Sequence, residues 1–170
     1  AEMKRDAHVE PEIALRVVVR DAEEAGARGG ERAQARFAVS VFPAAALAEN
    51  SSPELLQAVR AFAEKHDLGY TIHLSQSRAE VDYVRKHHGV SPVGFLAKHN
   101  FLGPRLFAAH CRYVDDADIA LLAKSGTIVS HQAAMAANRG VIPPIPALRP
   151  PGVPIAMGTD NNTTDLFEVM

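Results

Sequence analysis

Residues 70–77 read Tyr-Thr-Ile-His-Leu-Ser-Gln-Ser, and they contain the unit from which the chain is built. The first part, Tyr70–Leu74, is a short apolar run of the length and composition typical of a strand buried on both faces of a sheet. The segment that follows, from Ser77 to His88, has apolar residues at helical spacing. The stretch therefore predicts a strand followed directly by a helix.

The same unit recurs along the rest of the chain. Further apolar runs predict strands at Arg36–Phe42, Arg105–Ala109, Thr127–Ser130 and Pro154–Gly158. Helical patterns lie between them, from Ser52 as N-cap to about His66, at Pro92–His99, and at Asp115–Lys124 with Gly126 closing the helix. Strands that alternate with helices favour right-handed repeats around a parallel sheet, which is an α/β fold. Either an open doubly wound sheet or part of a (β/α)8 barrel fits this pattern.

Other segments carry separate expectations. The pattern from Pro11 to about Ala27 predicts a helix, and Pro43 is expected to end the strand before it. The stretch Ala133–Pro154 holds six of the 11 prolines and is expected to be irregular. The helix start at Asp165–Met170 has no closing Gly, Asn or Pro, so we expect the sequence to be part of a longer chain.

The composition is that of one ordinary soluble domain. The 170 residues are 47% hydrophobic and 22% charged, and 18 Lys+Arg against 20 Asp+Glu give a net charge of −2. This balance lacks the basic character of a nucleic-acid-binding surface, and no apolar run approaches the roughly 20 residues of a membrane span. The single cysteine, Cys111, excludes an internal disulfide framework and a Cys-rich zinc module, and it fits a reducing cytoplasm.

Four of the predicted strands end in a histidine or an aspartate, namely His73, His110, His131 and Asp160. One histidine at a strand end is usually a structural residue. In parallel α/β folds, however, the carboxyl ends of the strands bear the chemistry, so four such groups at equivalent positions favour function. Imidazole nitrogen and carboxylate oxygen are ligands that suit zinc, iron and similar divalent ions. The set therefore predicts a catalytic metal site.

The residues around these strand ends resemble a known family. They are similar in order and spacing to strands five, six, seven and eight of the amidohydrolase superfamily, at Thr71–Ser75, Ala109–Cys111, Val129–His131 and Gly158–Asp160. The branch they resemble contains triazine hydrolases and guanine, pterin, cytosine and methylthioadenosine/S-adenosylhomocysteine deaminases. The resemblance runs from about Arg36 to Met170. It implies an incomplete (β/α)8 TIM barrel, comprising about strands four to eight.

The resemblance also implies a role for each residue. His73 and His110 would be metal ligands, with His110 among the catalytic groups, and Asp160 would be both a ligand and the general base for the metal-activated water. His131 would lie near the reacting end of the substrate, and Asn161 beside Asp160 is a candidate polar contact. The implied cofactor is one divalent ion, zinc or iron. The implied substrate is a small aromatic N-heterocycle, which is attacked at a ring carbon and releases ammonia or an amine.

Two positions depart from the family pattern. The strand-five histidine is commonly followed three residues later by a proton-shuttling glutamate, and this chain has Gln76 there. A glutamine amide orients a substrate by hydrogen bonds but does not titrate near neutral pH, so a catalytic and substrate-binding Gln76 implies an altered proton relay. Gln132 and Ala133 replace the Asn and Pro that usually follow the strand-seven histidine.

The family's first-strand His-x-His pair occurs nowhere in this sequence. Residues 1–170 are therefore expected to be a partial hydrolase barrel domain, without the N-terminal β-domain and the first barrel strands. In the leading hypothesis, the chain is the carboxyl-side half of a metal-dependent aminohydrolase, and we expect a homo-oligomer. In the alternative, it is a non-catalytic half-barrel that associates with itself or a partner through exposed strand edges. A metal-free site on an open α/β sheet ranks third.

Overall fold

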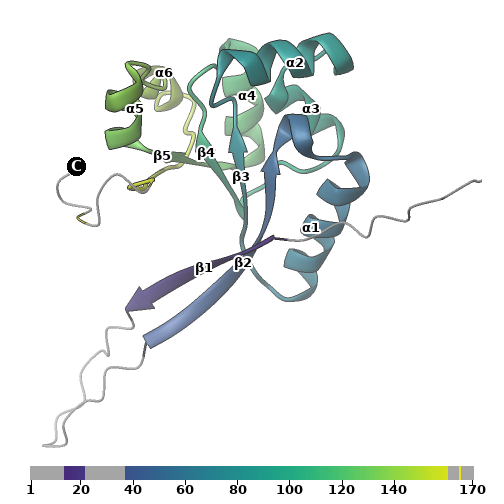
Figure 1. The fold of residues 1–170 in the computed structure, drawn as a ribbon, viewed down its shortest axis with the longest axis vertical. Coiled ribbons are helices and arrows are strands. Elements are labelled where there is room, and N and C mark those ends of the chain that lie inside the picture. The colour runs from purple at the N-terminus through teal and green to yellow at the C-terminus, as the bar shows by residue number, and fades with distance from the viewer. Residues whose placement is uncertain (1–13, 22–36, 161–164, 166–170) are drawn as a thin grey trace, which may run out of the picture.

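The computed structural model describes residues 14–21, 37–160 and 165. They form a six-stranded sheet with helices packed against it (Figure 1). The strands are β1 (Ala14–Asp21), β2 (Phe37–Leu47), β3 (Tyr70–Leu74), β4 (Leu106–His110), β5 (Ile128–His131) and β6 (Ile155–Met157). The helices are the 3-10 turn η1 (Ala48–Asn50), α1 (Pro53–Lys65), α2 (Arg78–His88), α3 (Pro92–Lys98), α4 (Asp116–Ser125), α5 (Ala133–Arg139) and α6 (Ile145–Leu148).

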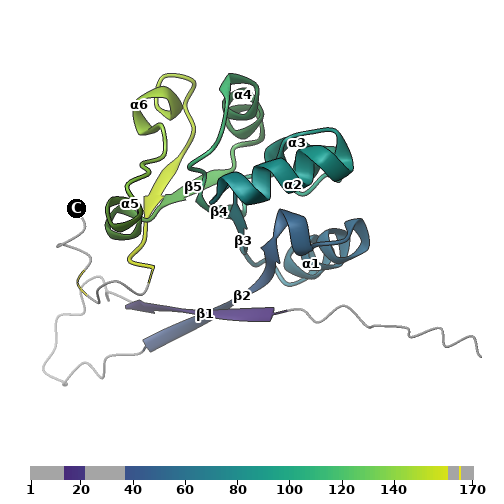
Figure 2. The same cartoon turned by 45° about the horizontal axis from the view of Figure 1, so that its top comes forward.

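The strands lie in the sheet in the order in which they follow one another along the chain, and β2 to β6 are parallel. A doubly wound sheet reverses its strand order at a switch point, whereas strands that stay beside their predecessors wind in one direction, as in a barrel. Figure 2 shows α1 to α4 as an arc along one side of this row of strands. The order rejects the doubly wound alternative and confirms the α/β class.

The strand and helix positions predicted for residues 53–131 are confirmed to within a residue or two. The caps explain why the helices begin and end where they do. Ser52 Oγ accepts a hydrogen bond from the Leu55 N–H, and Asp115 forms a capping box with Asp118 at the start of α4. Gly126 ends α4 in the left-handed conformation, at a φ of 70°.

The helix predicted from Pro11 to about Ala27 is wrong where the structure describes it. Residues 14–21 form β1, which pairs antiparallel with β2. The sequence there contains three successive valines, Val17–Val19, and β-branched side chains favour an extended backbone when a partner strand satisfies the main chain. The residues paired with these three valines are 20 to 24 positions further along the chain, so a local helical pattern does not reveal them. The flanking parts of the predicted helix lie outside the described residues.

Prolines end fewer elements than expected. Strand β2 continues through Pro43 to Leu47, because Pro43 lies opposite Leu15 of β1 and the pairing with β3 begins only at Ala44. The stretch Ala133–Pro154, expected to be irregular, contains the short helices α5 and α6. Residue Gly140 ends α5 at a φ of 66°.

The core joins the strands to the helices that cover them. Leu56, Ile72, Phe95 and Leu122 are fully buried in one cluster of apolar side chains. Cys111 is buried in the same cluster, and burial raises the pKa of its thiol, so it is a packing residue and not a nucleophile. No described helix is long and apolar enough to cross a membrane.

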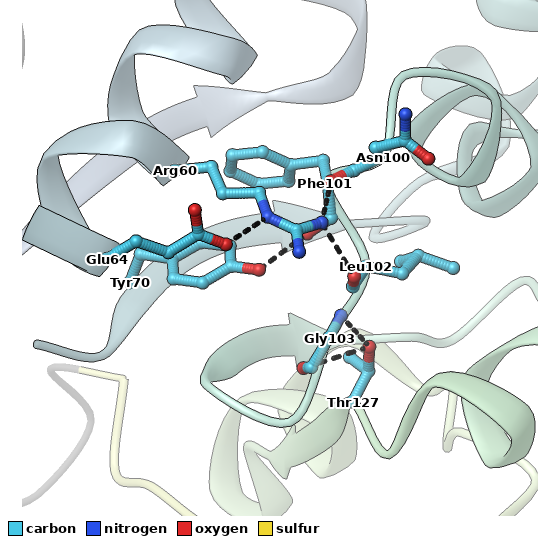
Figure 3. Close-up of polar contacts among 8 residues, drawn as sticks. All are labelled: Arg60, Glu64, Tyr70, Asn100, Phe101, Leu102, Gly103 and Thr127. Atoms are coloured by element: carbon cyan, nitrogen blue, oxygen red, sulfur yellow. Dashed lines mark hydrogen bonds and ion pairs between the residues drawn. The ribbon is translucent and has the colours of Figure 1, made fainter. Parts of the chain in front are cut away.

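A polar cluster around Arg60 fixes the amino ends of the strands (Figure 3). From α1, the Arg60 guanidinium donates to the carbonyls of Asn100 and Leu102 and pairs with Glu64 at 2.7 Å. The Tyr70 hydroxyl, at the start of β3, donates to the Phe101 carbonyl at 2.9 Å. The loop that leads into β4 is therefore held by side chains of α1 and β3. This cluster is structural, because chemistry in barrel folds belongs to the opposite, carboxyl ends of the strands.

We expect Arg60→Met to lower the free energy of unfolding by about 1–3 kcal/mol, because it leaves two loop carbonyls without their charged donor. The measurement is urea unfolding followed by circular dichroism. The matched control is Arg85→Met, which removes an exposed ion pair with Asp115 and should cost about 0–1 kcal/mol. Equal costs for the two variants would contradict the assigned role of Arg60.

Candidate functional site

A cavity of about 370 Å³ opens at the carboxyl ends of the parallel strands. Its described lining residues come from four places along the chain: His73, Gln76, Ser77, His110, Arg112, Met135, Arg139 and Asp160. The set includes four of the six site residues predicted from the sequence. Parallel pairing explains the convergence, because His73 and His110 end neighbouring strands and Asp160 follows β6 at the same edge.

His73 is oriented by the neighbouring strand. Its Nδ1 lies 2.9 Å from the main-chain oxygen of Ala46 in β2, so Nδ1 carries the proton and donates it. The lone pair of the ring is then on Nε2, which is the arrangement that metal-binding histidines use. The His73 ring stacks on the ring of His110, with centroids 5.5 Å apart and planes at 20°.

His110 is buried at 4% exposure and lies between two charged groups. Its Nε2 is 3.9 Å from Asp160 Oδ2, and its Nδ1 is 3.3 Å from Nη2 of Arg112. Both His110 and Asp160 have left-handed backbones, with φ values of 77° and 50°. Non-glycine residues rarely adopt this conformation, and such strain gathers at sites where geometry is imposed for function.

These groups fit a divalent ion in chemistry but not yet in arrangement. Two imidazoles and a carboxylate are the donor types of catalytic zinc sites. Among the described residues, however, no three His, Cys, Asp or Glu side chains lie close enough together to form a metal site. Because a guanidinium only donates, the contact with Arg112 also requires a lone pair on His110 Nδ1, whereas binding a metal through Nε2 needs the other tautomer. The structure thus shows two neighbouring pairs of potential metal ligands, His73 with His110 and His110 with Asp160, rather than three side chains arranged around one ion.

Gln76 lines the cavity from the loop after β3, and a buried carboxylate fixes this loop. Glu80 Oε1 and Oε2 accept the main-chain N–H groups of Ser75 and Gln76, each at 2.8 Å. Ser75 is left-handed at a φ of 48°, and Glu80 is fully buried. Burial raises the pKa of the Glu80 carboxyl to about 7. The sequence reasoning missed Glu80, although Ser77 and Glu80 have the spacing of a helix capping box.

Four of the lining residues were not predicted as site residues from the sequence, and two of them, Arg112 and Arg139, are charged; the others are Ser77 and Met135. Arg112 follows β4, and its Nη1 lies 3.5 Å from the Gln76 carbonyl. Burial lowers the pKa of Arg112, the nearby Asp160 opposes that effect, and Arg139 adds to it. The distance of these two arginines from the cavity depends on how the turn after β4 and the end of α5 fold, which no local sequence pattern indicates.

Of the two remaining predicted residues, the structure describes only His131. His131 ends β5 but is not among the residues that line the cavity. Its Nδ1 is buried without a hydrogen-bond partner in the described part of the chain, and burial, aided by Arg112, lowers the pKa of the ring. Asn161 lies outside the described residues.

Comparison with known proteins identifies related sequences. The profile of the Amidohydrolase family matches residues 9–170. The chain is 40% identical over 125 residues to a 5'-deoxyadenosine deaminase of Methanothermobacter thermautotrophicus, covering 70% of this chain and 29% of that protein. It is also 40% identical over 125 residues to a 5-methylthioadenosine/S-adenosylhomocysteine deaminase of Syntrophobacter fumaroxidans, which covers 70% of this chain and 28% of that protein. The chain thus spans less than a third of the length of these relatives.

Solved structures share the fold. An adenosine deaminase from Xanthomonas campestris with bound zinc superposes with a TM-score of 0.64 at 25% identity, covering 68% of this chain and 27% of that one. Atrazine chlorohydrolase from Arthrobacter aurescens, complexed with zinc, gives 0.60 at 24% identity, covering 64% and 24%. At 24% identity, the similarity to atrazine chlorohydrolase indicates a shared fold and not a shared activity. With the strand order, these matches confirm the incomplete barrel predicted from the sequence.

The raised pKa of Glu80 predicts a pH dependence of stability. Between about pH 4.5 and 7 the folded chain holds a proton on Glu80 that the unfolded chain has lost, so stability falls as the pH rises through this window. The expected loss is on the order of 3 kcal/mol. Glu80→Gln should remove it, whereas Asp82→Asn, a matched change on the exposed side of α2, should not. Urea unfolding at pH 5 and pH 8 measures the difference, and identical pH slopes for Glu80→Gln and the parent would refute it.

Proposed function

The chain belongs to the amidohydrolase family, and we propose that it forms the carboxyl-side half of a metal-dependent aminohydrolase site for an adenosine-type nucleoside or similar N-heterocycle. The observation that supports this most is the convergence of His73, His110 and Asp160 on one cavity at the strand ends. The deaminases of Methanothermobacter and Syntrophobacter support the substrate class. Hydrolysis of a C–N bond would release ammonia or an amine.

In this proposal, His73, His110 and Asp160 hold one divalent ion, and zinc is preferred to iron because the adenosine deaminase from Xanthomonas campestris contains bound zinc. The bound ion would supply a water nucleophile that is activated at neutral pH. His73 is prepared for this role, because its Nδ1 proton is held by the Ala46 carbonyl. His110 has to change tautomer, which also ends its contact with Arg112.

Asp160 and Gln76 divide the remaining catalytic work in the proposal. Asp160 Oδ2 accepts the proton of the attacking water, as the strand-eight aspartate of the family does. The Gln76 amide orients the ring of the substrate by donating and accepting hydrogen bonds, and it transfers no proton. We assign His131 and Asn161 to further substrate contacts, on the family resemblance alone.

We also propose a cytoplasmic location and a homo-oligomer. The single, buried Cys111 fits a reducing compartment. Within the described residues, β6 pairs with β5 only, so its second edge leaves main-chain groups open to another strand. In this proposal, a strand of a second copy of the chain pairs with the open edge of β6. This open edge also favours the second candidate function, a non-catalytic half-barrel that acts by association.

Single substitutions test the metal site. We expect His73→Ala, His110→Ala and Asp160→Ala each to weaken zinc binding by more than about 100-fold, because each removes a direct ligand. The measurement is competition with a chromophoric chelator on the full chain, with circular dichroism as the check on folding. His87→Ala, which changes an exposed histidine of α2, is the control and should bind zinc like the parent. Undiminished zinc binding after all three ligand changes would refute the site.

Light scattering tests the association. We expect the full chain to be a dimer or larger at micromolar concentration, and Met157→Lys to shift it toward monomer by placing a charge on β6. The control is Ile142→Lys, which changes an apolar side chain that is 68% exposed and lies outside the sheet. A monomeric parent chain would contradict the association, and deaminase activity of that monomer would exclude the non-catalytic candidate.

A further inference from the structure

Two arginines line the cavity, and the proposed chemistry uses neither of them. Arg112 follows β4 and Arg139 is the last residue of α5, so they reach the cavity from different elements. Neither forms an ion pair with any carboxylate in the described part of the chain. Among the described lining residues, Asp160 is the single carboxylate opposite these two guanidinium groups. The cavity therefore has an excess of positive charge even before a metal ion is added.

Arg112 has hydrogen-bonding capacity that the described residues do not use. Its Nη1 and Nη2 contact the Gln76 carbonyl at 3.5 Å and His110 Nδ1 at 3.3 Å, which are long distances for a charged donor. Its Nε is buried and has no hydrogen-bond partner among the described residues. A buried donor without an acceptor is costly, and a guanidinium presents its N–H groups as a fork that matches carboxylate and phosphate oxygens.

Metal binding would increase this capacity. His110 can bind a metal through Nε2 only when its Nδ1 carries the proton, and Nδ1 then no longer accepts from Arg112. Arg112 would lose one of its two acceptors at the moment when the site becomes loaded. An anionic oxygen of a bound substrate would replace it.

We propose that Arg112 and Arg139 form an anion subsite, which binds a carboxylate or phosphate group on the substrate. This inference rests on the proposed function, because the same cavity would hold the heterocycle. A purely structural role is the competing explanation, in which Arg112 braces the loop after β3 and Arg139 faces the carbonyl end of α5. The two explanations differ in one measurable property, which is the preference of the cavity for anionic ligands.

Matched pairs of nucleosides measure this preference on the full chain loaded with zinc. Adenosine is compared with adenosine 5'-monophosphate for the phosphate, and 5'-methylthioadenosine with S-adenosylhomocysteine for the carboxylate, by isothermal titration calorimetry at low and high salt. We expect the member that carries the phosphate or the carboxylate to bind about ten-fold or more tightly than its partner in at least one pair at low salt, and this ratio to shrink as salt is added. The pair that shows the ratio identifies the anion.

Variants assign the preference to the two arginines. Arg112→Gln and Arg139→Gln should each bring the ratio to within about three-fold of unity, whereas Arg149→Gln, an equal charge change at an exposed residue outside the cavity, should preserve it. Equal affinities within both pairs, no measurable binding of the compounds that carry the phosphate or carboxylate, or a ratio unchanged in both cavity variants would overturn the subsite.

Repeating the titration on chelator-treated chain separates the anion subsite from the proposed function. An anion preference that persists without zinc supports the subsite even if zinc-dependent deamination fails.

Discussion

Parallel pairing of β3 with β4 is the constraint on which the rest of the site depends. The register places His73 opposite Ala109 and Leu74 opposite His110, so the two histidines leave the sheet at the same edge. Because side chains alternate between the faces of a strand, this register alone would put the two rings on opposite faces. His110 has a left-handed backbone, at a φ of 77°, and its ring stacks on the ring of His73. The pairing of β5 with β6 brings Asp160, which follows β6, to the same end of the sheet. Strand pairing and the turn at His110 together bring these groups to one place.

The loops after the strands add precision to this arrangement. Ser75, His110 and Asp160 all have positive φ values, and each such residue costs on the order of 1–3 kcal/mol, which contacts with its surroundings must offset. Around Ser75 the fixing group is the buried Glu80 carboxylate, which holds two consecutive N–H groups. Strands β3 and β4 pack apolar side chains in the core and lead into turns with left-handed residues, and such well-supported elements are where pre-organised sites are built.

Much of the fold could be predicted from the sequence because its signals are local. Apolar runs mark β3 to β6, and Ser52 and Gly126 mark helix ends that the structure confirms. Strand β1 could not be predicted, because its valines adopt an extended conformation only through pairing with β2. The strand-end position indicated His73, His110 and Asp160, whereas Arg112 and Arg139 reach the cavity from a turn and a helix end. Glu80 does not line the cavity but holds the loop that carries Gln76. A residue pattern does not show how such turns fold back on a neighbouring strand.

In the proposed site, residues at the ends of β3 and β4 and after β6 supply the ligands of one metal ion. X-ray absorption at the zinc edge of the zinc-loaded chain measures this, because scattering from imidazole rings counts the histidine ligands. We expect two imidazoles with oxygen ligands, and one imidazole fewer in each of His73→Ala and His110→Ala. A parent spectrum with no imidazole contribution, or variant spectra identical to that of the parent, would contradict it.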